Sequence, residues 1–194
     1  MKIIVLENNY ENAEIEDLLS WYLISDSALT NWGKPFFYPL EMSKVSVQAS
    51  IAIRISRLGK SVSSRFAPRY YHEVAPMLHF FFPQLKEKLV NRGLSFSRAV
   101  SFDKSLIYGE FKEMPDDMEN LKLDLTVNRQ LAVNFDISKL RYGIDELIPK
   151  VSEMNTLKMG DLILPALSEP VEIFIGDLIE LKGGFVNPLS VKIK

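Results

Sequence analysis

Polar side chains that could bind a ligand follow a β-strand pattern in the first third of the chain. Apolar and polar residues alternate from position 45 to 55, which predicts a strand whose even-numbered side chains share one face. Gln48, Ser50 and Arg54 fall on that face. The planar guanidinium of Arg54 has the shape to bind a carboxylate, and a solvated or ion-paired arginine is the alternative interpretation.

The two histidines are the other candidates for metal chemistry. A zinc site needs about three protein ligands drawn from His, Cys and carboxylates, and His72 is the only imidazole that could join His79. Their odd spacing places them on opposite faces of an extended segment. We therefore expect no zinc site, and we interpret His79, which precedes three phenylalanines, as a partly buried side chain with a backbone partner.

Composition excludes several classes of function. The chain has no cysteine, which excludes thiolate catalysis, disulfides and Cys-based zinc sites. Its formal net charge of -2 shows no excess of Lys and Arg of the kind that binds nucleic acid. No apolar run approaches the roughly 20 residues that span a bilayer. We expect neither a nucleic-acid nor a membrane partner, and a reducing cytoplasm is the simplest location.

The elements that must position these side chains are mostly strands. Strands are predicted over residues 2–6, 45–55 and 121–127. Two copies of Gly-Asp-Leu-Ile, at 160–163 and 176–179, are interpreted as turns that lead into successive strands of one sheet. With 47% hydrophobic residues and no linker, the whole chain, 1–194, is expected to form one β-rich domain.

Three short helices are also predicted. Asn12 is a plausible N-cap for a helix with an apolar face made of Ile15, Leu18, Leu19 and Tyr22. Pro83 opens a second helix that stops near Gly93. A third begins near Ile144, and Pro149 is expected to interrupt it or end it early.

Several segments of the chain, in order and with few gaps, resemble small bacterial members of the fumarylacetoacetate hydrolase family. These segments are 1–10, 26–39, 53–71, 101–103, 144–164 and 175–188. The resemblance implies a β-rich mixed α/β fold, a mixed β-sandwich roll with short flanking helices, and a dimer. It also implies Mg²⁺- or Mn²⁺-assisted cleavage, decarboxylation, hydration or isomerisation of 2-oxo and β-diketo acids.

The same resemblance places the family's metal ligands on residues of different chemistry. The family's Glu-x-Glu pair falls on Gln48 and Ser50, and its third ligand, an aspartate, falls on His79. Hard cations depend on anionic oxygen ligands, which an amide, a hydroxyl and an imidazole do not supply. We therefore predict that no Mg²⁺ or Mn²⁺ cofactor is bound.

The remaining machinery that the resemblance implies is also replaced. The family's lysine before the Ser-Phe-Asp triplet falls on Val100. Its substrate-binding Thr-Gly-Thr-Pro loop falls on residues 165–168, where Pro165 lacks an amide donor and Leu167 lacks a hydroxyl. Its general-base histidine falls on Asn12 or Ala13. We predict no catalytic residue, and the altered positions that could line a ligand pocket are Gln48, Ser50, His79, Val100 and Leu167.

Two hypotheses remain open at this point. The first is a non-catalytic family member that binds a small organic acid, pairs with an active paralogue, or has no ligand. The second is an active family hydrolase, decarboxylase or isomerase whose site is relocated or metal-free. A homodimer is the expected assembly, with a hetero-oligomer containing an active paralogue as the alternative.

Overall fold

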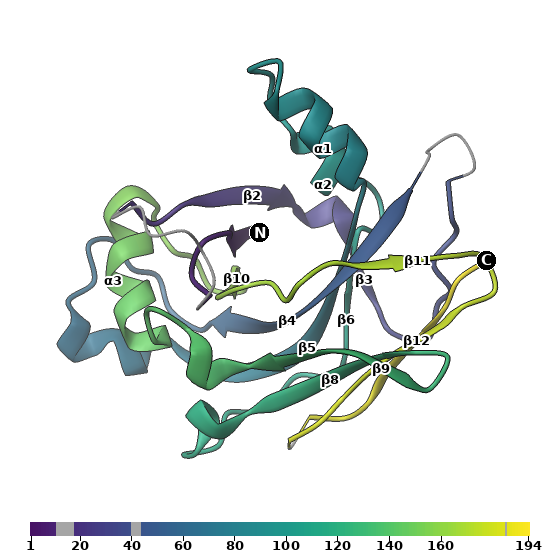
Figure 1. Ribbon diagram of the computed structural model, residues 1–194. Coiled ribbons are helices and arrows are strands. Elements are labelled where there is room, and N and C mark those ends of the chain that lie inside the picture. The colour runs from purple at the N-terminus through teal and green to yellow at the C-terminus, as the bar shows by residue number, and fades with distance from the viewer. Residues whose placement is uncertain (11–17, 40–43, 185) are drawn as a thin grey trace.

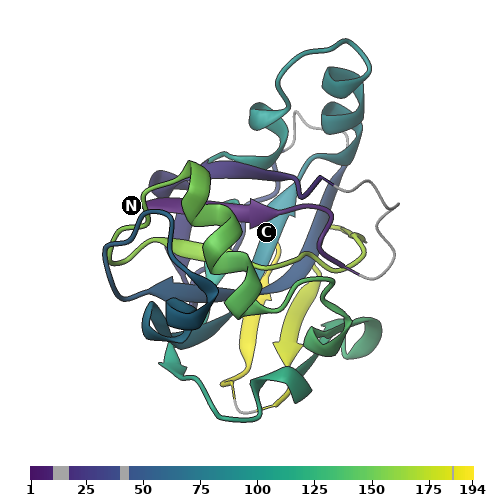
Figure 2. The ribbon, with the colours of Figure 1, turned by 90° about the vertical axis from the view of Figure 1, so that its left-hand side faces the viewer.

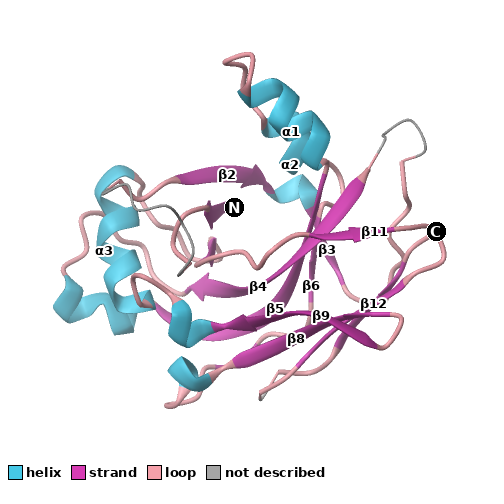
Figure 3. Ribbon diagram, in the orientation of Figure 1, coloured by secondary structure: helices cyan, strands magenta, loops and turns pink. Residues whose placement is uncertain are grey.

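The protein is built mainly of strands arranged in two sheets, with short helices around them (Figures 1 and 3). The computed structural model describes residues 1–10, 18–39, 44–184 and 186–194. The larger sheet is nine-stranded, with the order β2 (Trp21–Ser25), β1 (Lys2–Leu6), β10 (Leu162–Leu164), β4 (Val45–Ile55), β5 (Tyr71–Phe81), β6 (Leu106–Tyr108) and β3 (Leu29–Asn31). In addition, β11 (Val171–Ile173) pairs with β4, and β7 (Lys112–Glu113) pairs with β5.

The smaller sheet is four-stranded and antiparallel. Its order is β13 (Leu189–Lys192), β12 (Leu178–Lys182), β8 (Lys122–Val127) and β9 (Gln130–Asp136). The main core lies between the two sheets: Ile51 and Leu78 of the larger sheet belong to the same buried cluster as Leu125 and Leu181 of the smaller one. The β1–β10 and β3–β6 pairs are parallel, and the architecture is the mixed β-sandwich roll that the family resemblance implies.

The helices are short and lie around the periphery of the sheets (Figure 1). They are α1 (Pro83–Val90), α2 (Ser97–Val100) and α3 (Ile144–Met154), with 3₁₀ turns η1 (Asp26–Ala28), η2 (Ser64–Arg69), η3 (Met118–Asn120) and η4 (Ile137–Lys139). Figure 2 shows α3 lying across one end of the molecule, where Leu147, Ile148 and Val151 are buried in the core. Within the described residues, no helix has the length and apolar character needed to cross a membrane.

Strand β4 is confirmed with the predicted bounds, and its register with β5 positions the candidate site. Gln48 pairs with His79, and Ser50 pairs with Met77. Directly opposed residues share one face of a sheet, as do residues two apart on a strand. Gln48, Ser50 and His79 therefore lie on the same face, whereas the alternate residues Ala49 and Ile51 point into the core between the sheets.

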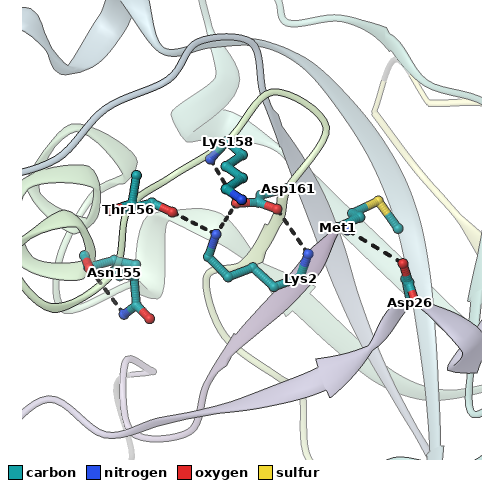
Figure 4. Close-up of polar contacts among 8 residues, drawn as sticks. Met1, Lys2, Asp26, Asn155, Thr156, Lys158 and Asp161 are labelled. Atoms are coloured by element: carbon teal, nitrogen blue, oxygen red, sulfur yellow. Dashed lines mark hydrogen bonds and ion pairs between the residues drawn. The ribbon is translucent and has the colours of Figure 1, made fainter.

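A buried carboxylate fixes the parallel pair β1–β10 (Figure 4). Asp161 is 1% exposed, and its side chain accepts hydrogen bonds from the backbone N–H of Lys2 at 2.9 Å and of Lys158 at 2.8 Å. The ammonium of Lys2 also contacts Asp161 and donates to the carbonyl of Thr156 at 2.7 Å. These contacts hold the first strand against the turn that leads into β10.

Three expectations about elements need correction. The predicted helix after Asn12 falls largely outside the described residues, but Tyr22 lies in strand β2, where pairing with β1 satisfies the backbone. Pro149 neither interrupts nor ends α3, which runs on to Met154, because burial of Ile148 and Val151 outweighs the lost hydrogen bond. The two Gly-Asp-Leu-Ile turns lead into β10 and β12, which belong to different sheets.

Candidate functional site

The side chains at the predicted metal-ligand positions all bond to backbone carbonyl oxygens. The amide Nε2 of Gln48 donates to the carbonyl of Ser168 at 2.8 Å. The hydroxyl of Ser50 donates to the carbonyl of Ala166 at 2.6 Å. The Nε2 of His79 lies 3.0 Å from the carbonyl oxygen of Val100. A carbonyl oxygen can only accept, so Nε2 of His79 carries the proton.

His79 is a neutral, buried imidazole. Its side chain is fully buried, and desolvation lowers its pKa from 6.5 to about 4, with the nearby Lys86 ammonium acting in the same direction and the Val100 hydrogen bond opposing them. Its ring stacks on Phe81 with centroids 5.9 Å apart. The backbone partner confirms part of the sequence interpretation, but the burial of the side chain is complete and not partial as predicted. Among the described residues, Nδ1 has no hydrogen-bond partner.

This set of groups does not fit a divalent cation. Gln48, Ser50 and His79 are uncharged, and each uses a proton to hold a backbone carbonyl. Mg²⁺ and Mn²⁺ sites in proteins are built mainly from carboxylate oxygens, whose negative charge offsets the cost of dehydrating the ion, and none of these three side chains supplies one. No group of three or more His, Cys, Asp or Glu side chains with metal-binding geometry occurs in the part of the chain that the structure describes.

The loop over residues 165–168 lies directly on strand β4. The backbone N–H of Ser168 donates to the carbonyl of Ala49 at 2.9 Å, and the Ser168 hydroxyl accepts from the backbone N–H of Ala49 at 2.9 Å. On its other side, the amide of the buried Asn9 donates to the carbonyl of Pro165 at 2.9 Å. The loop therefore runs along the edge of β4, held by the backbone of Ala49 and by the side chains of Gln48 and Ser50.

A cavity of about 310 Å³ opens beside this loop. Its lining residues come from five segments and are Glu7, Tyr10, Gln48, Phe81, Lys86, Leu167, Ser168, Glu169 and Pro170. Of the five pocket candidates from the sequence, Gln48 and Leu167 line the cavity. Ser50, His79 and Val100 are at most 1% exposed and do not line it.

The charged groups of the cavity were not singled out from the sequence. Lys86 on α1 and Glu7 after β1 form an ion pair with a separation of 2.7 Å, and their side chains are 32% and 26% exposed. The Lys86 ammonium also lies 5.0 Å from the centroid of the Phe96 ring. Lys86 lies seven residues after His79, where the resemblance places the family's third metal ligand, and that proximity was the available signal.

Two other sequence candidates have structural roles. Arg54 pairs with Glu73 at 2.9 Å and stacks over the ring of Phe111, which supports the ion-paired interpretation. His72 and His79 both lie on β5, with His72 exposed and His79 buried, as their odd spacing predicts. Neither Arg54 nor His72 lines the cavity.

Solved structures share this architecture along the whole chain. Fumarylpyruvate hydrolase from Pseudomonas aeruginosa, solved in complex with Mn²⁺ and pyruvate, superposes with a TM-score of 0.91 at 16% identity, covering 100% of this chain and 89% of that one. For 5-carboxymethyl-2-hydroxymuconate delta-isomerase from Mycobacterium smegmatis, the TM-score is 0.89 at 22% identity, covering 99% and 78%. These similarities establish the fold.

Sequence comparison establishes the family. Mitochondrial oxaloacetate tautomerase FAHD1 of Bos taurus is 27% identical over 175 residues, which cover 89% of this chain and 79% of the relative. The corresponding protein of Rattus norvegicus is 26% identical over the same shares. The family profile described as fumarylacetoacetate (FAA) hydrolase C-terminal matches residues 5–165. The chain therefore belongs to the fumarylacetoacetate hydrolase family.

Proposed function

We propose that this chain is a non-catalytic member of the family, which keeps a pocket for a small organic acid and lacks the metal-dependent chemistry. The observation that carries the proposal is the hydrogen bonding of Gln48, Ser50 and His79, each of which donates to a backbone carbonyl. A carboxylate cannot donate such a bond. The side chains at these positions hold the surrounding loops together and supply no charge for a cation.

The proton-transfer positions support the same proposal. Val100, where the resemblance places a lysine, is a 1% exposed apolar side chain whose carbonyl accepts from His79. A pKa of about 4 keeps His79 neutral near pH 7, and its Nε2 proton is engaged with Val100. General acid–base catalysis requires a group whose pKa lies near the working pH and within reach of substrate. Val100 and His79 do not meet that requirement.

A ligand-binding role is supported by the cavity beside Gln48 and Leu167. Its volume of about 310 Å³ falls in the range of small-molecule sites. Lys86 provides a cation at its wall, and Phe81 and Pro170 provide apolar surface.

The proposal also covers assembly and location. The chain forms a homodimer in the cytoplasm, and an assembly with an active paralogue is the alternative.

The proposal is tested by assaying turnover of oxaloacetate and of an acylpyruvate with Mg²⁺ or Mn²⁺. The bovine oxaloacetate tautomerase serves as positive control on oxaloacetate. We expect no turnover above the uncatalysed background. Metal-dependent turnover that Ser50→Ala or His79→Ala abolishes would instead establish the active-enzyme alternative.

A further inference from the structure

The cavity beside β4 has an unusual balance of charge for a pocket that would receive an organic anion. Its lining contains two carboxylates, Glu7 and Glu169, and a single ammonium, Lys86. Glu169 is exposed, whereas Glu7 and Lys86 are half-buried and paired with each other. A 2-oxo acid would bring further negative charge to this lining, and like charges held close together repel.

The paired charges retain unused hydrogen-bonding capacity. Lys86 has three donors, and the hydrogen bonds of the described residues use one, to Oε1 of Glu7. The second carboxylate oxygen of Glu7 has no donor within the described chain. Since Nε2 of Gln48 donates to Ser168, its amide oxygen is oriented as an acceptor, and it too receives no donor from described residues. Donor and acceptor groups thus lie in one small cavity.

We propose that this cavity binds a zwitterionic α-amino acid, with its carboxylate on Lys86 and its ammonium on Glu7 and the Gln48 amide oxygen. This refinement rests on the proposed function, because it names the class of small acid that the pocket takes. A zwitterion supplies one charge of each sign, so both members of the Glu7–Lys86 pair gain a partner. The apolar wall formed by Phe81, Leu167 and Pro170 suits an aliphatic side chain.

Tight binding should require both the ammonium and the carboxylate of the ligand. Hydrogen bonds between ionised groups are about twice as strong as neutral ones. A ligand that lacks its ammonium leaves the Glu7 carboxylate and the Gln48 oxygen without the added donor, and one that lacks its carboxylate leaves Lys86 without the added acceptor. Loss of either group should weaken binding by about tenfold or more.

The test is calorimetry on the full chain at pH 7 with four compounds that share one aliphatic skeleton. They are L-leucine, 4-methylpentanoate without the ammonium, 3-methylbutylamine without the carboxylate, and 4-methyl-2-oxopentanoate with an oxo group in place of the ammonium. L-leucine should bind with a saturable heat, and the other compounds about tenfold or more weakly. Equal or tighter binding of any of the others, or no binding of L-leucine at millimolar concentration, overturns the inference.

Variants locate the site. Lys86→Met and Glu7→Gln should each reduce L-leucine affinity by about tenfold or more, while Lys88→Met, an exposed lysine on the same helix, should not. Melting temperatures without ligand show whether each variant is folded, and unchanged affinity in both cavity variants overturns the assignment. Absence of L-leucine binding together with absence of metal-dependent turnover would refute this inference and leave the proposed function standing. Metal-dependent turnover would refute the proposed function itself.

Discussion

At the scale of single residues, the candidate site is a set of donors that hold carbonyl groups. Ser50 is fully buried, and its hydroxyl lies 2.6 Å from the carbonyl oxygen of Ala166. Gln48 makes the equivalent contact two residues along the same loop, with Ser168. These side chains fix the loop over residues 165–168 against β4. They therefore contribute to stability in a way that carboxylates at the same positions could not.

Ser50→Ala should lower the free energy of unfolding by about 1–3 kcal/mol, because it leaves the buried carbonyl of Ala166 without that donor. Urea denaturation of parent and variant measures the difference. Ser46→Ala is the matched control: Ser46 lies on the same face of β4 and makes no side-chain hydrogen bond among the described residues. A loss for Ser50→Ala no larger than that for Ser46→Ala would contradict the structural role.

His79 should make stability fall as the solution becomes acidic. Its pKa is about 4 in the folded protein and 6.5 without burial, so between these values the unfolded chain binds a proton that the folded protein does not. The contribution of His79 to the free energy of unfolding is fully present above about pH 6.5. It is lost as the pH falls to about 4 and does not change further below that. The loss over this range is roughly 3 kcal/mol.

The measurement is chemical denaturation at several pH values between 4 and 7. His79→Gln removes the titrating group and should flatten this part of the profile, whereas His72→Gln, exposed on the same strand, should keep the slope of the parent. An unchanged slope in His79→Gln would show that another group causes the pH dependence.

At the scale of elements, the parallel β1–β10 pair depends on Asp161 (Figure 4). Asp161→Ala removes the acceptor for the backbone N–H groups of Lys2 and Lys158 and should cost about 2–4 kcal/mol in thermal or urea unfolding. Asp26, which is 54% exposed and lies 3.4 Å from the amino terminus, is the control, and Asp26→Ala should cost less than about 1 kcal/mol. Equal losses would mean that Asp161 does not anchor the strand.

The sequence predicted those elements whose local pattern and tertiary environment agree. Every odd-numbered residue from 45 to 55 is apolar and buried, and strand β4 has those bounds. Prediction failed where tertiary contacts decide: Tyr22 fits a helical spacing, yet it pairs with Val5 in a sheet. Similarly, the rule that proline ends a helix failed at Pro149, because packing of the neighbouring Ile148 holds α3 together.

The candidate site was predictable only in part, for the same reason. Strand alternation placed Gln48 and Ser50 on one face, and the resemblance brought His79 to that region. The Glu7–Lys86 pair was not foreseen, because its members lie far apart in sequence and a lone charged residue is usually solvated. Only the fold shows that both line the same cavity, and only the fold shows which carbonyls Gln48 and Ser50 hold.

At the scale of the whole molecule, we expect two copies to associate. Phe174 and Ile175 remain 59% and 56% exposed in the single chain, and burial of such apolar surface favours association. Sedimentation or light scattering at micromolar concentration should give twice the 22.2 kDa mass of one chain. A single-chain mass would contradict the expectation, and co-purification with a related chain at equal amounts would indicate the paralogue partner instead.

The central claim is that the positions of Gln48, Ser50 and His79 do not bind a divalent cation, and calorimetric titration of the protein with Mn²⁺ tests it most directly. The account predicts no saturable heat at millimolar Mn²⁺ near pH 7, because the groups are neutral and are bonded to carbonyls. The parent and Ser50→Ala should behave alike. Saturable binding with a dissociation constant below about 1 mM, a free energy beyond about 4 kcal/mol, that Ser50→Ala weakens would contradict it.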